Sequence, residues 1–189
     1  MKIMKKDKIH TMNLDSLINE MGSKDIKYKK MMKRFQIVFF IFIFLYAGLF
    51  IINPDPDLTI YDRMAGLCYV VAFTLFTIQF RSLHKKFKQV NYCDPVKKVL
   101  KDAEKRYRLW HKNLLLVGIA ILCIDAASIL VMFDRFNERW TIWEFILIVQ
   151  VLYFVLIGIG FTFGYLRWRN ESRPIWLSAK TLLEELGEK

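Results

Sequence analysis

The sequence predicts an all-α integral membrane protein, a bundle of four transmembrane helices from which a cytoplasmic helical hairpin extends. Hydrophobic residues form 54% of the 189-residue chain, and they gather in four segments, residues 35–52, 64–80, 114–133 and 142–166. Each segment is long enough to cross a hydrocarbon core of about 30 Å at about 1.5 Å per helical residue, with some tilt or thinning of the bilayer. We expect one membrane domain, residues 1–189.

Basic residues avoid one side of these spans. Of the 29 Lys and Arg residues, ten precede the first span, eleven lie between the second and third, and five follow the fourth. Only Arg63, Arg135 and Arg139 lie near the two short connections on the other side. This positive-inside pattern predicts a multi-pass inner (cell) membrane protein with both termini in the cytoplasm. Topology and anionic lipid headgroups account for the net charge of +11, so nucleic acid is not an expected partner.

The chain is predicted to begin with a basic cytoplasmic segment, residues 1–34, which leads into the first span. Three methionines within the first twelve residues are candidate starts of translation. Apolar residues at helical spacing predict a short helix over residues 12–21 that stops at Gly22, followed by a basic interfacial helix. The aromatic span 35–52 ends in NPDPD, whose prolines disfavour a helix, so spans one and two are expected to be antiparallel neighbours.

The long central connection, residues 81–113, is predicted to be a basic helical hairpin that extends spans two and three. Its second arm has no strong helix breaker from Pro95 to about Phe133, so one continuous helix is expected there. The second arm carries an apolar stripe. Either this stripe packs against the first arm, or the second arm lies flat on anionic lipid. The stripe consists of Val96, Val99, Leu100, Ala103, Tyr107 and Trp110. The opposite face, expected to meet lipid or a partner, carries Lys97, Lys98, Lys101, Lys105 and Arg108.

The C-terminal segment, residues 167–189, is predicted to be a cytoplasmic amphipathic helix. Tryptophan and tyrosine flank both ends of the preceding span, which is typical of membrane interfaces. The apolar positions after Pro174 recur at helical spacing, and the last residues are acidic. We therefore expect this helix to fold back on the basic hairpin.

A layer of polar side chains is predicted inside the membrane. Asp125 and Gln150 each lie about 12 Å below the outer end of their span. A charged group there costs at least about 2.5–3.5 kcal/mol, so it should face protein or water. Tyr46, Tyr69 and Ser128 complete the expected layer. Its role is either structural, most simply a hydrogen bond between Asp125 and Gln150, or that of a proton or ion site.

Small residues indicate where the spans could approach one another closely. Gly118 shares the helical face of Asp125, and Gly160-x-x-x-Gly164 lies near the inner end of span four. Such spacing allows close helix packing. We expect Gly118 to let another helix approach its face, and Gly160 and Gly164 to pack within the bundle, with contact between copies of the chain in a homo-oligomer as the alternative for the latter two.

Catalytic and metal-binding motifs are missing from the sequence. No metalloprotease, nucleophile-elbow or phosphate-loop pattern appears. The three cysteines form no pair, and the three histidines are scattered, so neither a disulfide framework, nor a metal, nor a cofactor is predicted. The first span lacks the carboxylate of small multidrug transporters, and both outer loops are too short for a tetraspanin-like protein.

The function best suited to this pattern is that of a non-enzymatic membrane protein whose basic cytoplasmic helices bind a partner protein and anionic lipid. The only large patterned surface outside the lipid is on the cytoplasmic side. The alternative is a small oligomeric transporter or channel component that uses Asp125 as a protonatable coupling group. A lipid enzyme is a third hypothesis, for which Asp62 and Glu144 at the outer surface would be needed, although such residues more often cap helices.

Overall fold

The computed structural model describes residues 14–109, 114–136 and 142–187, which form helices joined by short loops and contain no strand. The elements are α1 (Leu14–Tyr46), η1 (Ala47–Ile52), α2 (Ile60–Lys88), α3 (Val96–Tyr107), α4 (Leu114–Phe136), α5 (Ile142–Arg167), η2 (Trp168–Ser172) and α6 (Arg173–Gly187). Two of them, η1 and η2, are π-helical continuations of α1 and α5.

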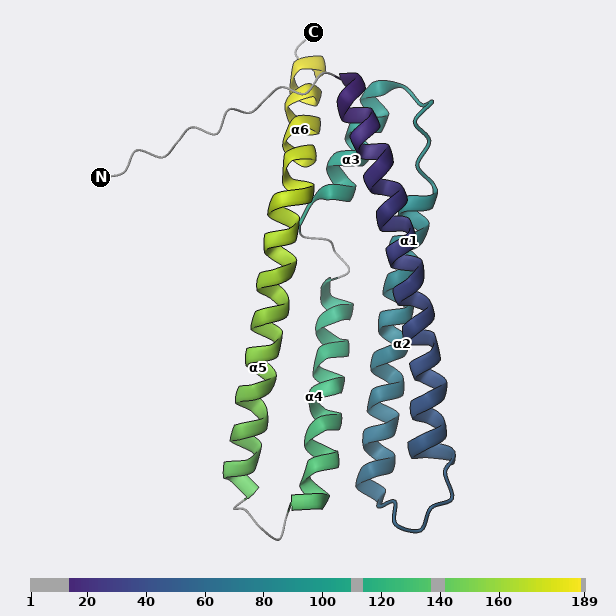
Figure 1. Cartoon of the computed structure of the whole chain (residues 1–189), viewed down its shortest axis with the longest axis vertical. Coiled ribbons are helices and arrows are strands. Elements are labelled where there is room, and N and C mark those ends of the chain that lie inside the picture. Colours follow the sequence, from purple (N-terminus) through teal and green to yellow (C-terminus); the bar gives the residue numbers. More distant parts are fainter. Residues whose placement is uncertain (1–13, 110–113, 137–141, 188–189) are drawn as a thin grey trace, which may run out of the picture.

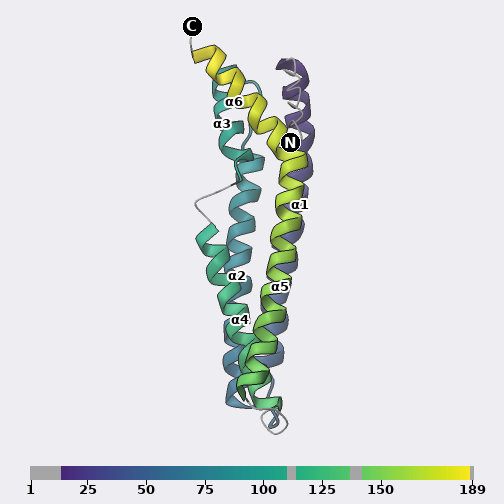
Figure 2. The ribbon, with the colours of Figure 1, turned by 90° about the vertical axis from the view of Figure 1, so that its left-hand side faces the viewer.

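Four of the described helices are long and apolar enough to cross a membrane. They contain the four apolar segments of the sequence, and they run side by side along the longest axis of the molecule (Figure 1). Helix α2 packs along both α1 and α4, whereas α5 meets α4 over fewer residues. Helices α3 and α6 and the first half of α1 lie together at one end (Figures 1 and 2).

Aromatic side chains join α1 to α2. Phe39 stacks on Phe76 and Phe80 with ring centroids 5.0 Å and 5.5 Å apart, and Tyr46 lies 4.8 Å from Tyr69. Aromatic pairs of this kind contribute about 0.5–1.5 kcal/mol each beyond the area they bury. If these helices cross a membrane, burying apolar surface does not favour contact between them, because lipid is equally apolar. Close packing of the rings would then stabilise the contact between α1 and α2.

The close approach of two backbones occurs at Gly66, near the start of α2. A Cβ atom at this position would lie 2.3 Å from the Cβ of Phe50 in η1. By contrast, Gly118, Gly160 and Gly164 are exposed, and a Cβ at any of them would meet nothing within 4 Å. In the single chain, therefore, no other described helix approaches these three glycines closely.

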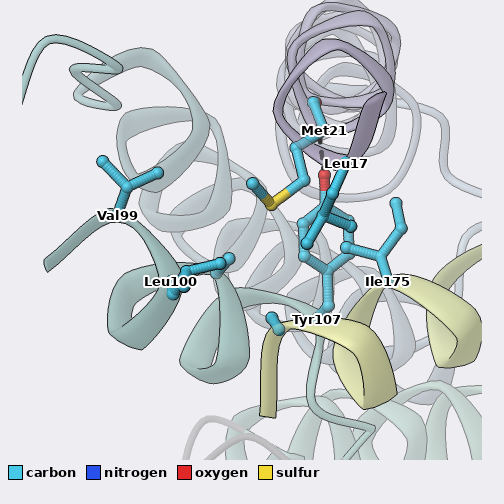
Figure 3. Packing of buried hydrophobic residues seen from close by; sticks show 8 residues of the cluster. Leu17, Met21, Val99, Leu100, Tyr107 and Ile175 are labelled. Atoms are coloured by element: carbon cyan, nitrogen blue, oxygen red, sulfur yellow. Dashed lines mark hydrogen bonds between the residues drawn. The ribbon is translucent and has the colours of Figure 1, made fainter. Parts of the chain in front are cut away.

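A compact polar end, which we call the headpiece, consists of residues 14–32, 81–109 and 168–187. Its core contains Leu17 and Met21 from α1, Val99, Leu100, Ala103 and Tyr107 from α3, and Ile175 and Ala179 from α6 (Figure 3). Burying a large apolar side chain in such a core contributes roughly 1.5–3 kcal/mol. The headpiece is thus a small globular helical assembly rather than a set of separate arms.

Three predictions about this end need correction. Gly22 does not stop a helix but lies inside α1, because the buried face continues past it to Asp25. The helix from Pro95 does not reach Phe133: α3 ends at Tyr107, and Arg108 is extended, with φ −65° and ψ 137°. Finally, α3 packs against α6, which the sequence predicted, and not against the end of α2.

Candidate functional site

The headpiece is built around a buried carboxylate that the sequence did not single out. Asp25 is 3% exposed and accepts hydrogen bonds from two tyrosine hydroxyls. Tyr92 Oη donates to Oδ2 over 2.5 Å, and Tyr107 Oη donates to Oδ1 over 2.5 Å. Arg106 Nη2 lies 3.1 Å from Oδ2 as an ion pair, although without the alignment of a hydrogen bond. One carboxylate therefore joins α1, the loop before α3, and α3 itself.

The electrostatics of this cluster keep both phenols protonated. Burial, together with the hydrogen bond and the negative charge of Asp25, raises the pKa of Tyr92 and of Tyr107 well above the ordinary value for tyrosine. The two hydroxyls remain hydrogen-bond donors throughout the neutral pH range. The cluster is therefore suited to fixing three segments in place.

Helix η2 is the part of the headpiece that directly continues the long apolar helix α5. Trp168 Nε1 donates to the carbonyl oxygen of Tyr107 over 2.9 Å, which satisfies a backbone acceptor at the end of α3. Lys24 Nζ donates to the carbonyl oxygen of Glu171 over 2.5 Å, and Tyr28 Oη donates to the carboxylate of Glu171 over 3.1 Å. The ends of α3 and α5 are thereby held against α1.

A cavity of about 320 Å³ lies where these segments meet at the base of the headpiece. Residues from α1, α2, the end of α3, α5 and η2 line it, among them three arginines: Arg106, Arg108 and Arg167. The sequence gives little signal for such a site, because the three arginines come from positions up to 61 residues apart and only the tertiary structure brings them to one cavity.

The residues of the predicted intramembrane layer lie close to one another. Gln150 Nε2 in α5 donates to both carboxylate oxygens of Asp125 in α4, over 3.0 Å and 3.1 Å. Ser128 and Tyr69 place their hydroxyl oxygens 3.4 Å apart, and the ring of Tyr69 contacts that of Tyr46. The contact between Asp125 and Gln150 that the sequence predicted is thus present.

The five basic residues predicted to face lipid or a partner are exposed, and one of them, Arg108, also lines the cavity. Lys98 forms an ion pair with Asp94 over 2.8 Å, and the other four have no ion-pair partner among the residues that the structure describes. The residues are Lys97, Lys98, Lys101 and Lys105 of α3 and Arg108 at its end. Trp110, the last member of the predicted apolar stripe, lies outside the described residues, and Val96, the first, is exposed.

Histidines and acidic residues elsewhere in the described chain have local structural contacts. Within these residues, no group of three His, Cys, Asp or Glu side chains could hold a metal ion. His84 Nδ1 lies 3.1 Å from the carbonyl oxygen of Lys29. Asp62 forms a capping box with Thr59 at the start of α2, which is the structural role expected of an acidic residue there.

Comparison with known proteins identifies no relative. No family model matches the chain, and neither a curated protein nor a solved structure matches it significantly.

Proposed function

We propose that this chain is a non-enzymatic, multi-pass protein of the cell membrane whose basic headpiece binds an acidic partner protein and anionic lipid headgroups in the cytoplasm. In this proposal the four long helices form a transmembrane bundle, and the headpiece with both termini lies inside. The distribution of Lys and Arg supports this orientation, since cytoplasmic segments carry the excess of positive charge.

The observation that carries the proposal is the division of α3 into two faces. One face, with Leu100 and Ala103, is fully buried in the headpiece core. The other presents exposed lysines at positions 97, 98, 101 and 105. Because most of the apolar stripe of α3 is covered by α1 and α6, the charged face is the surface of this helix that remains for a partner. A surface of one charge favours partners and headgroups of the opposite charge.

Site-specific crosslinking would test the proposal. A photocrosslinking residue at position 101 should yield a discrete adduct in native membranes, whereas the same residue at position 30, exposed on α1, should not. Replacing Lys97, Lys101 and Lys105 together by Gln should remove most of the adduct. High salt should weaken it in the unmodified chain, because exposed charges are screened within about 10 Å at 0.1 M salt.

A matched variant controls for the change in total charge. Lys30, Lys33 and Lys85 are also exposed and lie outside α3. Replacing these three by Gln should leave the adduct at position 101 intact. Equal loss in both triple variants, or an adduct that survives the α3 substitutions, would contradict the proposal.

A second candidate function is favoured by the carboxylate in α4. Asp125 is partly buried in a segment predicted to lie in the membrane, and such residues often mark proton or ion pathways. The chain would then be a small oligomeric transporter or channel component with Asp125 as its coupling group. An oligomer would also cover the exposed face of α5 that carries Gly160 and Gly164. The hydrogen bonds of Asp125 to a neutral amide favour the structural role instead.

A further inference from the structure

The cavity at the base of the headpiece lies at the boundary between the polar end and the apolar helices. Met31 and Met32 precede the apolar run of α1, and Gly164 belongs to the last apolar turns of α5; all three line the cavity. Its volume of about 320 Å³ lies within the usual range of small-molecule sites, about 300–1,000 Å³. In the proposed orientation this is the level of the inner lipid headgroups.

Positive charge exceeds negative charge around this cavity. Arg106 pairs with Asp25, and Arg167 Nε lies 3.3 Å from Glu171, which also has Lys27 Nζ at 3.9 Å. Arg108, the third arginine, has no carboxylate partner among the described residues. Four positive groups, three guanidinium groups and one lysine, thus surround the cavity with only two carboxylates, those of Asp25 and Glu171. This excess of positive charge would attract an anionic ligand.

Buried polar atoms around the cavity lack hydrogen-bond partners. The side chain of Arg106 is 10% exposed; its Nη2 atom is held by the ion pair with Asp25, and its Nε atom is buried without a hydrogen bond. Gln79 is 7% exposed, and its Oε1 atom is also buried without a hydrogen bond. Buried polar groups are nearly always hydrogen-bonded, so these atoms point to a ligand that accepts bonds from a guanidinium and donates one to an amide oxygen.

We propose that this cavity binds the headgroup of an anionic phospholipid, with its phosphate among Arg106, Arg108 and Arg167. Guanidinium groups match phosphate in charge and geometry. A headgroup hydroxyl, as in phosphatidylglycerol, donates to Gln79 Oε1. The apolar wall of Met31, Met32 and Leu83 takes the first carbons of an acyl chain. The site rests on the proposed membrane orientation, but it does not need the partner-binding face of α3.

Lipid binding to the purified full-length chain would test this site. The chain is delipidated in a neutral detergent, and dioleoyl phosphatidylglycerol is added at increasing concentration. Native mass spectrometry should show one retained lipid, and the midpoint of thermal unfolding should rise. Phosphatidylcholine and glycerol phosphate at the same concentrations should do neither. Equal protection by glycerol phosphate would identify a soluble phosphate as the ligand and overturn the lipid assignment.

Two variants separate this site from attraction to the whole basic surface. Arg108→Gln should weaken phosphatidylglycerol binding by roughly tenfold or more, the effect of losing one charge-assisted hydrogen bond. Gly164→Leu should block the apolar part of the cavity without changing any charge, and it should leave the fold intact because a Cβ there meets nothing within 4 Å. Lipid-free unfolding midpoints close to that of the unmodified chain would verify folding of both variants.

The matched controls are Arg169→Gln and Gly160→Leu. Arg169 is exposed in η2, Gly160 is exposed one turn from Gly164, and neither lines the cavity. Both controls should bind phosphatidylglycerol like the unmodified chain. Similar losses in test and control variants, or no loss in any variant, would overturn the proposal. The triple α3 lysine variant should lose its crosslinked partner while retaining the lipid, so the two proposals can fail independently.

Discussion

Asp25 shows how one residue can decide the arrangement of a small domain. Its carboxylate accepts bonds from Tyr92 and Tyr107 and lies against Arg106, at the centre of segments up to 82 residues apart. Burying a charge costs several kcal/mol, which a guanidinium and two hydroxyl donors offset. The cluster therefore stabilises one packing of α3 on α1, in which every member has a specific partner.

Removal of this carboxylate should destabilise the headpiece severely. We expect Asp25→Ala to lower the free energy of unfolding by roughly 3–5 kcal/mol, because Arg106 would remain as an uncompensated buried charge. Urea unfolding of the purified chain in mild detergent, followed by circular dichroism, would measure the change. The control is Asp102→Ala on the exposed side of α3, which should change stability by no more than about 0.5 kcal/mol. Equal effects of both substitutions would contradict this account of the cluster.

Asp125 is the residue on which the two candidate functions differ. As a structural partner of Gln150, it should tolerate Asp125→Asn with little loss of stability, because an amide can still accept the hydrogen bond. Asp125→Leu should cost roughly 0.6–1.7 kcal/mol, the range for hydrogen bonds between membrane helices. Unfolding in detergent and proton flux in proteoliposomes would be measured for both variants. A stable Asn variant that abolishes a measurable flux would favour the transporter.

At the scale of elements, the end of α3 illustrates how tertiary contacts override a helical sequence. No proline or glycine stands between Pro95 and Gly118, yet the helix stops at Tyr107. Tyr107 is held by Asp25 on one side and, through its carbonyl oxygen, by Trp168 on the other. These contacts direct α3 onto α6, and the chain leaves the helical path at Arg108. The resulting bend places Arg106 and Arg108 beside the cavity.

The contact between η1 and α2 depends on the absence of a side chain at Gly66. Gly66→Ala should destabilise the pair by about 1–3 kcal/mol, since its Cβ would lie 2.3 Å from that of Phe50 and the backbones would have to separate. Gly118→Ala is the control: it meets nothing within 4 Å and should stabilise α4 by about 0.5–1 kcal/mol through helix propensity. Thermal unfolding in detergent should therefore shift in opposite directions. A shift of the same sign in both variants would contradict the close approach.

At the scale of the whole molecule, two kinds of packing are combined in one chain. The headpiece has a buried apolar core and a charged exterior, as a water-soluble helical domain has. The long helices instead expose Phe, Leu and Ile over most of their surface, as expected for helices surrounded by lipid. The cavity with three arginines lies where the two kinds of packing meet, and this position is the basis for proposing a lipid headgroup there.

The sequence by itself determined the four apolar segments that could cross a membrane, because hydropathy is a local property of the chain. It also predicted the contact of Asp125 with Gln150, since the depth of each residue follows from counting along its own span. Only the tertiary structure decided that Gly66 would be the close contact and that α5 would leave Gly160 and Gly164 uncovered. The Asp25 cluster likewise joins residues 67 and 82 positions apart. Continuing the stripe of α1 past Gly22 would have suggested that Asp25 is buried. Its partners Tyr92 and Tyr107 come from the central connection, and no local pattern pairs them with a residue of α1.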